Sequence, residues 1–97
     1  MTYKLVLLER FYEDVAEARD YYDAIVSGLG ERLIDEVDAV LSVISENPLI
    51  FQKTRKNYRQ MKLNKFPYNL VYEVSIDSVI ISRLYHVKRN PRKKFKK

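Results

Sequence analysis

The sequence predicts an α+β fold, a β-α-α-β-β-β sandwich in which an antiparallel helical hairpin packs on one face of a small, mostly antiparallel sheet. Two observations lead to this prediction. Apolar residues recur at helical spacing in the first half of the chain and at alternate positions in the second half. The chain has 97 residues, of which 46% are hydrophobic, so residues 1–97 are expected to form a single domain with one core.

The first element expected is a strand over residues 2–8, TYKLVLL. Both of its alternating sets of positions hold apolar residues, which predicts burial on both faces of the sheet. We expect this strand to pair beside one of the strands that come later in the chain.

Two helices are expected next, over residues 9–26 and 31–47, because apolar residues recur in both at steps of three and four. The first apolar stripe consists of Phe11, Val15, Ala18, Tyr22 and Ile25. The second consists of Leu33, Val37, Val40, Leu41 and Ile44. The only two glycines, Gly28 and Gly30, lie between the stripes and predict a tight turn with positive φ. Pro48 ends the second helix.

Three strands are expected in the second half, at residues 58–63, 68–75 and 78–87, where β-branched and aromatic residues alternate with polar ones. The segments NKFP and SIDS separate them. Both connections are short enough for the turns of an antiparallel meander.

Charge is distributed unevenly along the chain. Residues 1–51 contain four basic and eleven acidic residues, a balance of −7, whereas residues 52–97 contain fourteen basic and two acidic residues, a balance of +12. Seven of the basic residues lie in residues 88–97, which we expect to be a basic C-terminal tail. The second half is therefore expected to bind an anionic partner, either nucleic acid or an acidic protein segment.

The composition also limits the kinds of site and location. The chain has no cysteine and one histidine, so disulfides and thiolate metal sites are excluded and we expect no metal and no cofactor. The apolar runs are far shorter than the roughly 20 residues of a membrane-spanning helix, and no signal-peptide pattern opens the sequence. We expect a cytoplasmic protein whose partners include neither a membrane nor a small-molecule substrate.

Four motifs, in this order, resemble one protein family. The segment GLG followed by a helix, then ENPLIF, then FPYNLVYEV, and finally a strand ending in YHVKRNP are similar to the RelE/ParE superfamily of bacterial type II toxins, often labelled plasmid stabilisation proteins. The resemblance covers nearly the whole chain and implies the same β-α-α-β-β-β sandwich. It also implies a toxin held inactive by a cognate antitoxin, whose partly disordered and often acidic segment wraps the toxin.

The resemblance leaves the target open between two branches. RelE-like toxins are ribosome-dependent endonucleases that cut messenger RNA, whereas ParE-like toxins bind DNA gyrase. The nuclease branch implies arginines that hold phosphate, and here Asn69 stands at one such position while Arg89 matches another. Phe95 stands where the nucleases have a C-terminal tyrosine. The segment HVKRNP is more similar to ParE-like members, so the gyrase-binding branch is favoured, and an inert relative that only binds its antitoxin is a third hypothesis.

His86 is the central candidate residue, with two alternative roles. As a catalyst it serves as general acid or base, since the ordinary pKa of histidine is about 6.5. As a structural residue it ends the last strand and is hydrogen-bonded to Tyr72 or Glu73. The nuclease hypothesis assigns catalysis to His86, Arg89, Arg59 and Arg83.

Arg59 and Arg83 lie within predicted strands. Each either faces the open side of the sheet, where it holds phosphate or an acidic partner, or forms a cross-strand pair with Glu73. Binding of the target or the antitoxin is expected in the basic segment after the last strand. Its candidate residues are Lys88, Arg89, Arg92, Lys93 and Lys94.

Overall fold

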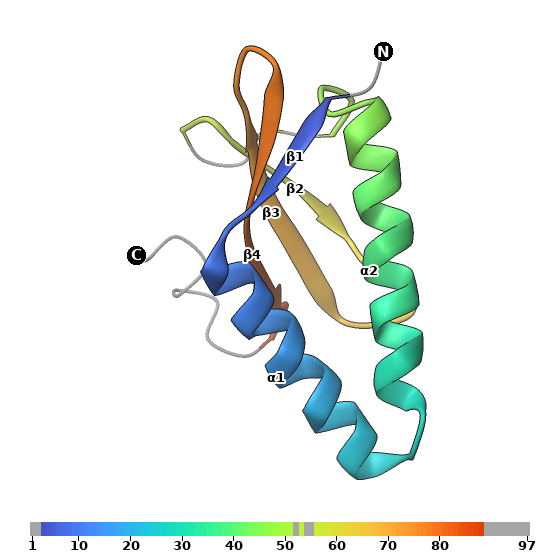
Figure 1. The fold of residues 1–97 in the computed structure, drawn as a ribbon. Coiled ribbons are helices and arrows are strands. Elements are labelled where there is room, and N and C mark those ends of the chain that lie inside the picture. Colours follow the sequence, from blue (N-terminus) through green and yellow to red (C-terminus); the bar gives the residue numbers. More distant parts are fainter. Residues whose placement is uncertain (1–2, 52, 54–55, 89–97) are drawn as a thin grey trace.

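In the computed structural model, two helices cover one face of a four-stranded sheet (Figure 1). The structure describes residues 3–51, 53 and 56–88. Its elements are β1 (Lys4–Leu7), α1 (Glu9–Ile25), α2 (Leu29–Glu46), β2 (Tyr58–Lys62), β3 (Tyr68–Val74) and β4 (Ser78–His86). The predicted α+β fold and the order β-α-α-β-β-β are confirmed.

The strand order across the sheet is β1-β4-β3-β2. Strands β2, β3 and β4 form the predicted antiparallel meander, and β1 runs parallel to β4, with Leu5 opposite Val79. The expectation that β1 is buried on both faces is wrong. Leu5 packs against the core, but Val6 is 37% exposed, because β1 is an edge strand and the helices cover only one face of the sheet.

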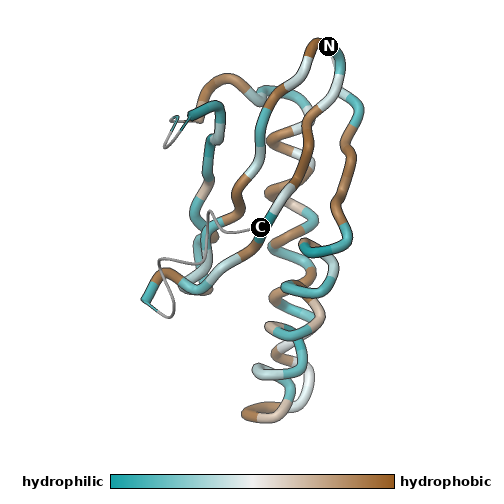
Figure 2. Tube along the Cα trace, turned by 90° about the vertical axis from the view of Figure 1, so that its left-hand side faces the viewer, coloured by the Kyte–Doolittle hydropathy of each residue, from teal (hydrophilic) through white to brown (hydrophobic). Residues whose placement is uncertain are grey.

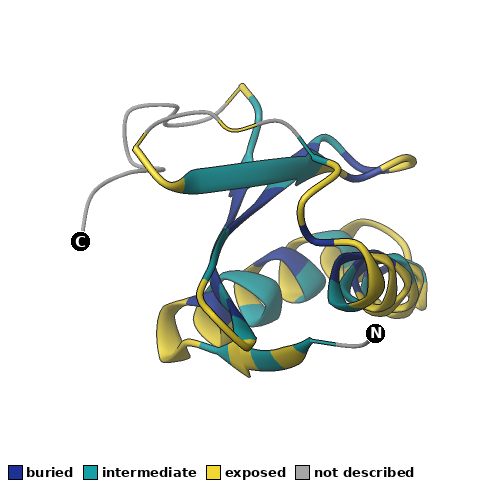
Figure 3. Cartoon of the chain, turned by 90° about the horizontal axis from the view of Figure 1, so that it is seen from above, coloured by how far each residue is buried: buried dark blue, intermediate teal, exposed yellow. Residues whose placement is uncertain are grey.

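The core lies between the helices and the sheet (Figure 3). Hydrophobic and hydrophilic residues alternate along the helices and strands (Figure 2), so each element presents one apolar side to this layer. Most of the two predicted stripes is buried or packed against the core. Ile25 is the exception, at 57% exposed, because the hairpin end of α1 extends beyond the sheet (Figure 1).

The turn between the helices uses its two glycines for different reasons. Gly28 has a φ of 90°, the left-handed conformation that the sequence predicted. Gly30 lies within α2, and a Cβ atom there would be 2.6 Å from the carbonyl oxygen of Arg19. The prediction that Gly30 is needed for a positive φ is therefore wrong. Glycine at this position instead allows α1 and α2 to approach closely. Its amide donates a hydrogen bond of 2.7 Å to Oδ1 of Asp23, so a side chain of α1 caps the start of α2.

A β-bulge sets which side chains share a face of the meander. Val71 lies opposite Arg83 and Tyr72 opposite Ile81, so β4 has one extra residue, Ser82, at this point. Alternation on either side of the bulge then assigns residues to the two faces. The helix-covered face holds Tyr68, Leu70, Tyr72, Arg59 and Met61, and the opposite face holds Asn69, Val71, Glu73, Gln60 and Tyr85.

Tyr72 links the sheet to the segment that follows α2. Its side chain is fully buried, and its hydroxyl donates a hydrogen bond of 2.7 Å to the carbonyl oxygen of Pro48. Burial raises the pKa of Tyr72 to about 12, although the positive charge of Arg59 acts in the opposite direction. The folded protein therefore keeps this tyrosine neutral at a pH where the unfolded chain ionises it.

This difference predicts a loss of stability at high pH. Below pH 10 the hydroxyl of Tyr72 is protonated in both the folded and the unfolded chain, so the free energy of unfolding does not depend on it. Between about pH 10 and 12 only the unfolded chain loses this proton, and the free energy of unfolding therefore falls by up to about 3 kcal/mol. Urea unfolding at a series of pH values measures this slope. The Tyr72→Phe variant should lose about 1–2 kcal/mol at neutral pH, because the buried Pro48 carbonyl loses its donor, and should show a shallower slope above pH 10. Equal slopes in the two proteins would contradict the assignment.

Candidate functional site

Strand β4 continues beyond the end of β1. Pairing between the two strands stops where Leu7 lies opposite Ile81, and the amide of Leu8 makes a further hydrogen bond of 3.0 Å to the carbonyl oxygen of Ile81. The chain then enters α1, which runs beside the last residues of β4 (Figure 1). The end of β4 therefore has a helix, not a strand, along this edge.

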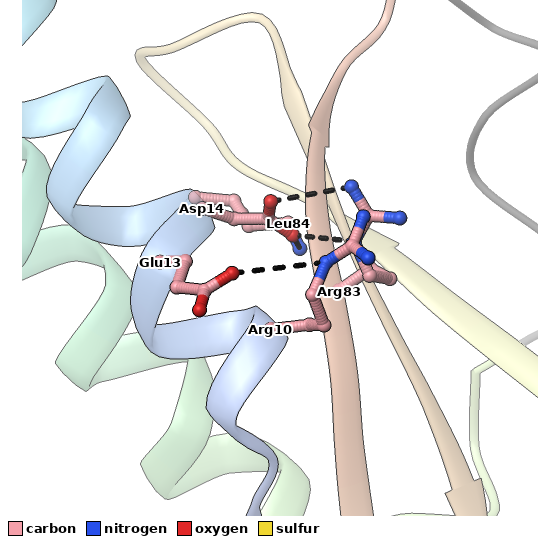
Figure 4. A network of polar contacts seen from close by, with 5 residues as sticks. All are labelled: Arg10, Glu13, Asp14, Arg83 and Leu84. Atoms are coloured by element: carbon pink, nitrogen blue, oxygen red, sulfur yellow. Dashed lines mark hydrogen bonds and ion pairs between the residues drawn. The ribbon is translucent and has the colours of Figure 1, made fainter. Parts of the chain in front are cut away.

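Asp14 of α1 binds this end of β4 (Figure 4). Its carboxylate accepts hydrogen bonds from the amide of Leu84 at 3.0 Å, from Nε of Arg83 at 2.6 Å and from Nη2 of Arg83 at 3.2 Å. The side chains of Asp14 and Arg83 are each only 14% exposed. One carboxylate thus satisfies both a strand-edge amide and a partly buried guanidinium.

A cleft of about 450 Å³ lies between α1 and the end of β4. Two of the predicted site residues, Arg83 and His86, line it together with Tyr68. The α1 side of the cleft contributes both acidic and basic side chains, among them an exposed Arg10–Glu13 pair at 3.9 Å. The cleft is polar and carries both signs of charge, unlike a uniformly basic phosphate site.

His86 ends β4 opposite Tyr68, and the two rings meet edge to face with their centroids 5.2 Å apart. Its Nδ1 accepts a hydrogen bond of 3.1 Å from the amide of Lys88. The expected hydrogen bond to Tyr72 or Glu73 is wrong, because Tyr72 lies opposite Ile81, further along β3, and its hydroxyl donates to Pro48. The sequence had placed His86 correctly at the strand end but not its neighbours, which depend on the register.

Arg59 lies away from this cleft, on edge strand β2 and on the helix-covered face opposite Tyr72. Its Nη1 donates to the carbonyl oxygens of Phe51, at 2.8 Å, and Leu49, at 3.3 Å. The expected cross-strand pair with Glu73 is wrong for both arginines, because Arg59 binds these carbonyls and Arg83 binds Asp14. The structure therefore brings Arg83 and His86 together and places Arg59 elsewhere.

The other face of the sheet carries a polar network that sequence reasoning missed. The hydroxyl of Tyr85 accepts a hydrogen bond of 2.8 Å from Nδ2 of Asn69 and donates one of 3.0 Å to Oε1 of Gln60. These three residues come from three adjacent strands, and Tyr85 is only 7% exposed. This face is therefore less open than expected. Only knowledge of the bulge in β4 could have placed Tyr85 on the same face as Asn69.

The remaining predicted binding residues lie at or beyond the end of the described chain. Lys88 is exposed just after β4. Arg89, Arg92, Lys93 and Lys94 lie outside the described residues. Within residues 3–51, 53 and 56–88, no group of three or more His, Cys, Asp or Glu side chains could hold a metal ion. Neither helix in the described part of the chain has the length and apolar character of a membrane span.

Comparison with known proteins finds similarity in structure. No protein-family model and no curated protein matches the chain. A structure of the chromosomal ParDE toxin–antitoxin system of P. aeruginosa matches 88% of this chain and 96% of its own, with a TM-score of 0.77 at 11% identity. The E. coli DinJ–YafQ toxin–antitoxin complex matches 89% of this chain and 93% of its own, with a TM-score of 0.65 at 12% identity.

A third solved structure, the RelBE2 toxin–antitoxin complex of Mycobacterium tuberculosis, matches 89% of this chain and 99% of its own, with a TM-score of 0.60 at 17% identity. At sequence identities this low, the structural matches establish a shared fold but not a shared activity. The predicted resemblance is thus confirmed for the fold: this chain has a fold that recurs in ParDE, DinJ–YafQ and RelBE toxin–antitoxin complexes.

Proposed function

We propose that this chain is the toxin component of a bacterial type II toxin–antitoxin system, that a cognate antitoxin neutralises it, and that it acts in the cytoplasm by binding a macromolecular target such as DNA gyrase. The observation that carries the proposal is the shared fold, since nearly the whole chain superimposes on a chain of the ParDE toxin–antitoxin system. The basic second half, with a balance of +12, suits an anionic or acidic partner.

The hydrogen bonds and ion pairs of the candidate catalytic side chains favour binding of a target over cleavage of RNA. In-line cleavage of RNA needs positive groups aimed at the phosphate and a side chain able to move a proton. The guanidinium of Arg83 is paired with Asp14, and that of Arg59 donates to two backbone carbonyls. These contacts support a structural role for both arginines over a role in holding phosphate.

The hydrogen bond at His86 also favours target binding over RNA cleavage. Nδ1 accepts the Lys88 amide, so the proton of the neutral ring is on Nε2. A general base needs a free lone pair, and an imidazolium would lose the Lys88 contact. His86 in this arrangement suits a strand end better than a proton carrier.

A ribosome-dependent mRNA endonuclease is the second candidate, because Arg83 and His86 line one cleft at the end of β4. In that case we propose that catalysis falls to His86, Arg83 and Arg89, whereas Arg59, the fourth residue predicted from the sequence, lies on β2 away from this cleft. In either case we propose Lys88, Arg89, Arg92, Lys93 and Lys94 as contacts to the target or the antitoxin.

Controlled production of the protein in bacterial cells tests both candidates. We expect production to arrest growth, and we expect the His86→Ala variant to arrest growth to within about threefold in viable count, because a target-binding toxin needs no proton carrier. Colony counts after induction measure this, with protein levels matched by immunoblot. A loss of toxicity of about a hundredfold or more in the folded His86→Ala variant would instead support the nuclease. Growth unaffected by the wild-type protein would leave an inert antitoxin-binding relative.

A further inference from the structure

Two consecutive residues of β4 direct three N–H donors at one point of the cleft between α1 and the end of β4 (Figure 4). The donors are Nε and Nη2 of Arg83 and the backbone amide of Leu84, and the two carboxylate oxygens of Asp14 accept from them. An arginine fork of this kind matches the two oxygens of a carboxylate. The arrangement has the form of a carboxylate receptor whose occupant belongs to the same chain.

The sheet holds the donor side of this receptor without help from Asp14. Arg83 and Leu84 lie opposite Val71 and Leu70 of β3, which pairs with the other edge of β4. Leu84 is 3% exposed and belongs to the core. Asp14 comes from a different element, 69 positions before Arg83 in the chain. Moving the Asp14 side chain therefore leaves the Leu84 amide and the backbone of Arg83 in place.

The receptor opens onto the cleft. Asp14, Arg83 and Leu84 all line this cleft of about 450 Å³. The side chains of Asp14 and Arg83 each remain 14% exposed. Rotation of one short side chain is thus enough to open the three donors to a ligand in the cleft.

Arg10 provides a second partner for the Asp14 carboxylate. It lies one helical turn before Asp14 on α1 and lines the same cleft. Its contact with Glu13, at 3.9 Å between side chains that are 55% and 60% exposed, contributes little to stability. Asp14 can therefore exchange Arg83 for Arg10, which lowers the cost of its displacement.

The charges of the cleft favour a carboxylate over a phosphate as the incoming ligand. Glu13 and Glu17 line the cleft on its α1 side. A carboxylate replaces the single negative charge of Asp14 one for one. A phosphate monoester carries close to two negative charges and is repelled more strongly by these glutamates.

We propose that Arg83 and the Leu84 amide form a carboxylate-binding site, that Asp14 fills it in the free protein, and that an Asp or Glu carboxylate of the target protein replaces Asp14 in the complex. The site and its ligand class rest on the geometry. The exchange with a target rests in addition on the proposed function. Asp14 is then a competitor of the target for the same donors.

Thermal unfolding of the purified Asp14→Ala chain, in sodium formate and in sodium chloride of equal ionic strength, tests the site. A ligand that binds only the folded chain raises Tm, so formate at about 0.5 M should raise the Tm of this variant by about 5 °C more than chloride does. The wild type, whose site is filled, should show no such difference. Asp14→Ser leaves the same donors open and is measured in parallel, so that a folding defect in one variant does not decide the result.

Asp20→Ala is the matched control. Asp20 accepts hydrogen bonds from Nε and Nη2 of Arg19 at 3.2 and 3.1 Å, but these side chains are 43% and 71% exposed and no strand amide joins them. This variant should respond to formate as the wild type does, and Asp14→Ala combined with Arg83→Met should lose the response. Equal responses of Asp14→Ala and Asp20→Ala, or a response that persists without Arg83, would overturn the site. A larger rise in phosphate than in formate would overturn its ligand class.

The exchange with a target is tested by the concentration of chain that half-inhibits DNA gyrase supercoiling. Asp14→Ala and Arg83→Met remove the same ion pair, so a purely structural role shifts this concentration in the same direction for both. Competition predicts opposite shifts, about threefold lower for Asp14→Ala and at least about tenfold higher for Arg83→Met. Circular dichroism below the Tm of each variant checks that the chains compared are folded. Shifts in the same direction would overturn the exchange.

The two assays keep this inference separate from the proposed function. A formate response without inhibition of supercoiling by the wild type would leave the carboxylate site and remove gyrase as the target. Inhibition of supercoiling without a formate response would leave the toxin and remove the site.

Discussion

Replacing Asp14 by alanine is expected to lower the free energy of unfolding by about 3 kcal/mol. Two losses add up in this variant. The guanidinium of Arg83, 14% exposed, is left without its carboxylate, and the amide of Leu84 loses its acceptor at the strand edge. Partial exposure of the pair keeps the effect below that of a fully buried ion pair. Urea denaturation measures it.

The Arg10–Glu13 pair on the same helix is the matched control. Its side chains are 55% and 60% exposed and its atoms are 3.9 Å apart, so Glu13→Ala should change stability by less than about 0.5 kcal/mol. A double-mutant cycle with Arg83→Met separates the ion pair from the Leu84 hydrogen bond, since Arg83→Met removes only the first. If Asp14→Ala lowered the free energy of unfolding no more than Glu13→Ala does, the contacts of Asp14 with Arg83 and Leu84 would not contribute measurably to stability.

The Gly30→Ala substitution should cost about 2–3 kcal/mol, which corresponds to a fall in Tm of about 10–20 °C for a domain of this size. The new methyl group would lie 2.6 Å from the carbonyl oxygen of Arg19 and 2.8 Å from Cγ of Asp23. The first contact is with backbone, which cannot rotate away, and the second displaces the carboxylate that caps α2. These costs exceed the gain of about 1 kcal/mol that alanine normally brings to a helix.

Gly28→Ala distinguishes packing from backbone strain. No atom lies within 4 Å of a Cβ atom at Gly28, but its φ of 90° is unfavourable for alanine, so we expect a cost of only about 1 kcal/mol. Thermal unfolding of both variants should therefore rank Gly30→Ala as clearly less stable. The reverse order would show that the helices do not approach each other as closely as the structure has them.

The fold was predictable because its elements have clear periods. The apolar residues of the α2 stripe recur at helical spacing, and all of them are buried or packed against the core. The segments NKFP and SIDS are short enough for hairpin turns. The errors came from tertiary placement. Val6 looks like a core residue until β1 is known to be an edge strand, and Ile25 continues a helical stripe past the edge of the sheet.

The candidate site was less predictable, since it depends on register and on contacts between distant segments. His86 was found because it is the only histidine, but its neighbour Tyr68 is fixed by the β3–β4 register. Asp14 is one of eleven acidic residues in the first half, and nothing in the sequence marks it as the partner of Arg83, 69 positions later. Glu36 could not be singled out either. Its carboxylate accepts hydrogen bonds from the amides of Asn64 and Lys65, and this contact depends on where the β2–β3 turn lies against α2.

The most direct test of the account is to measure target inhibition with one preparation of the purified full chain, free of antitoxin. The chain is added to a DNA gyrase supercoiling assay and, in parallel, to a bacterial translation extract with a defined message whose ends are mapped by primer extension. The account predicts inhibited supercoiling and an intact message, both unchanged in His86→Ala. Unaffected supercoiling together with new message ends within codons, lost in His86→Ala, would contradict it and make the protein a ribosome-dependent nuclease.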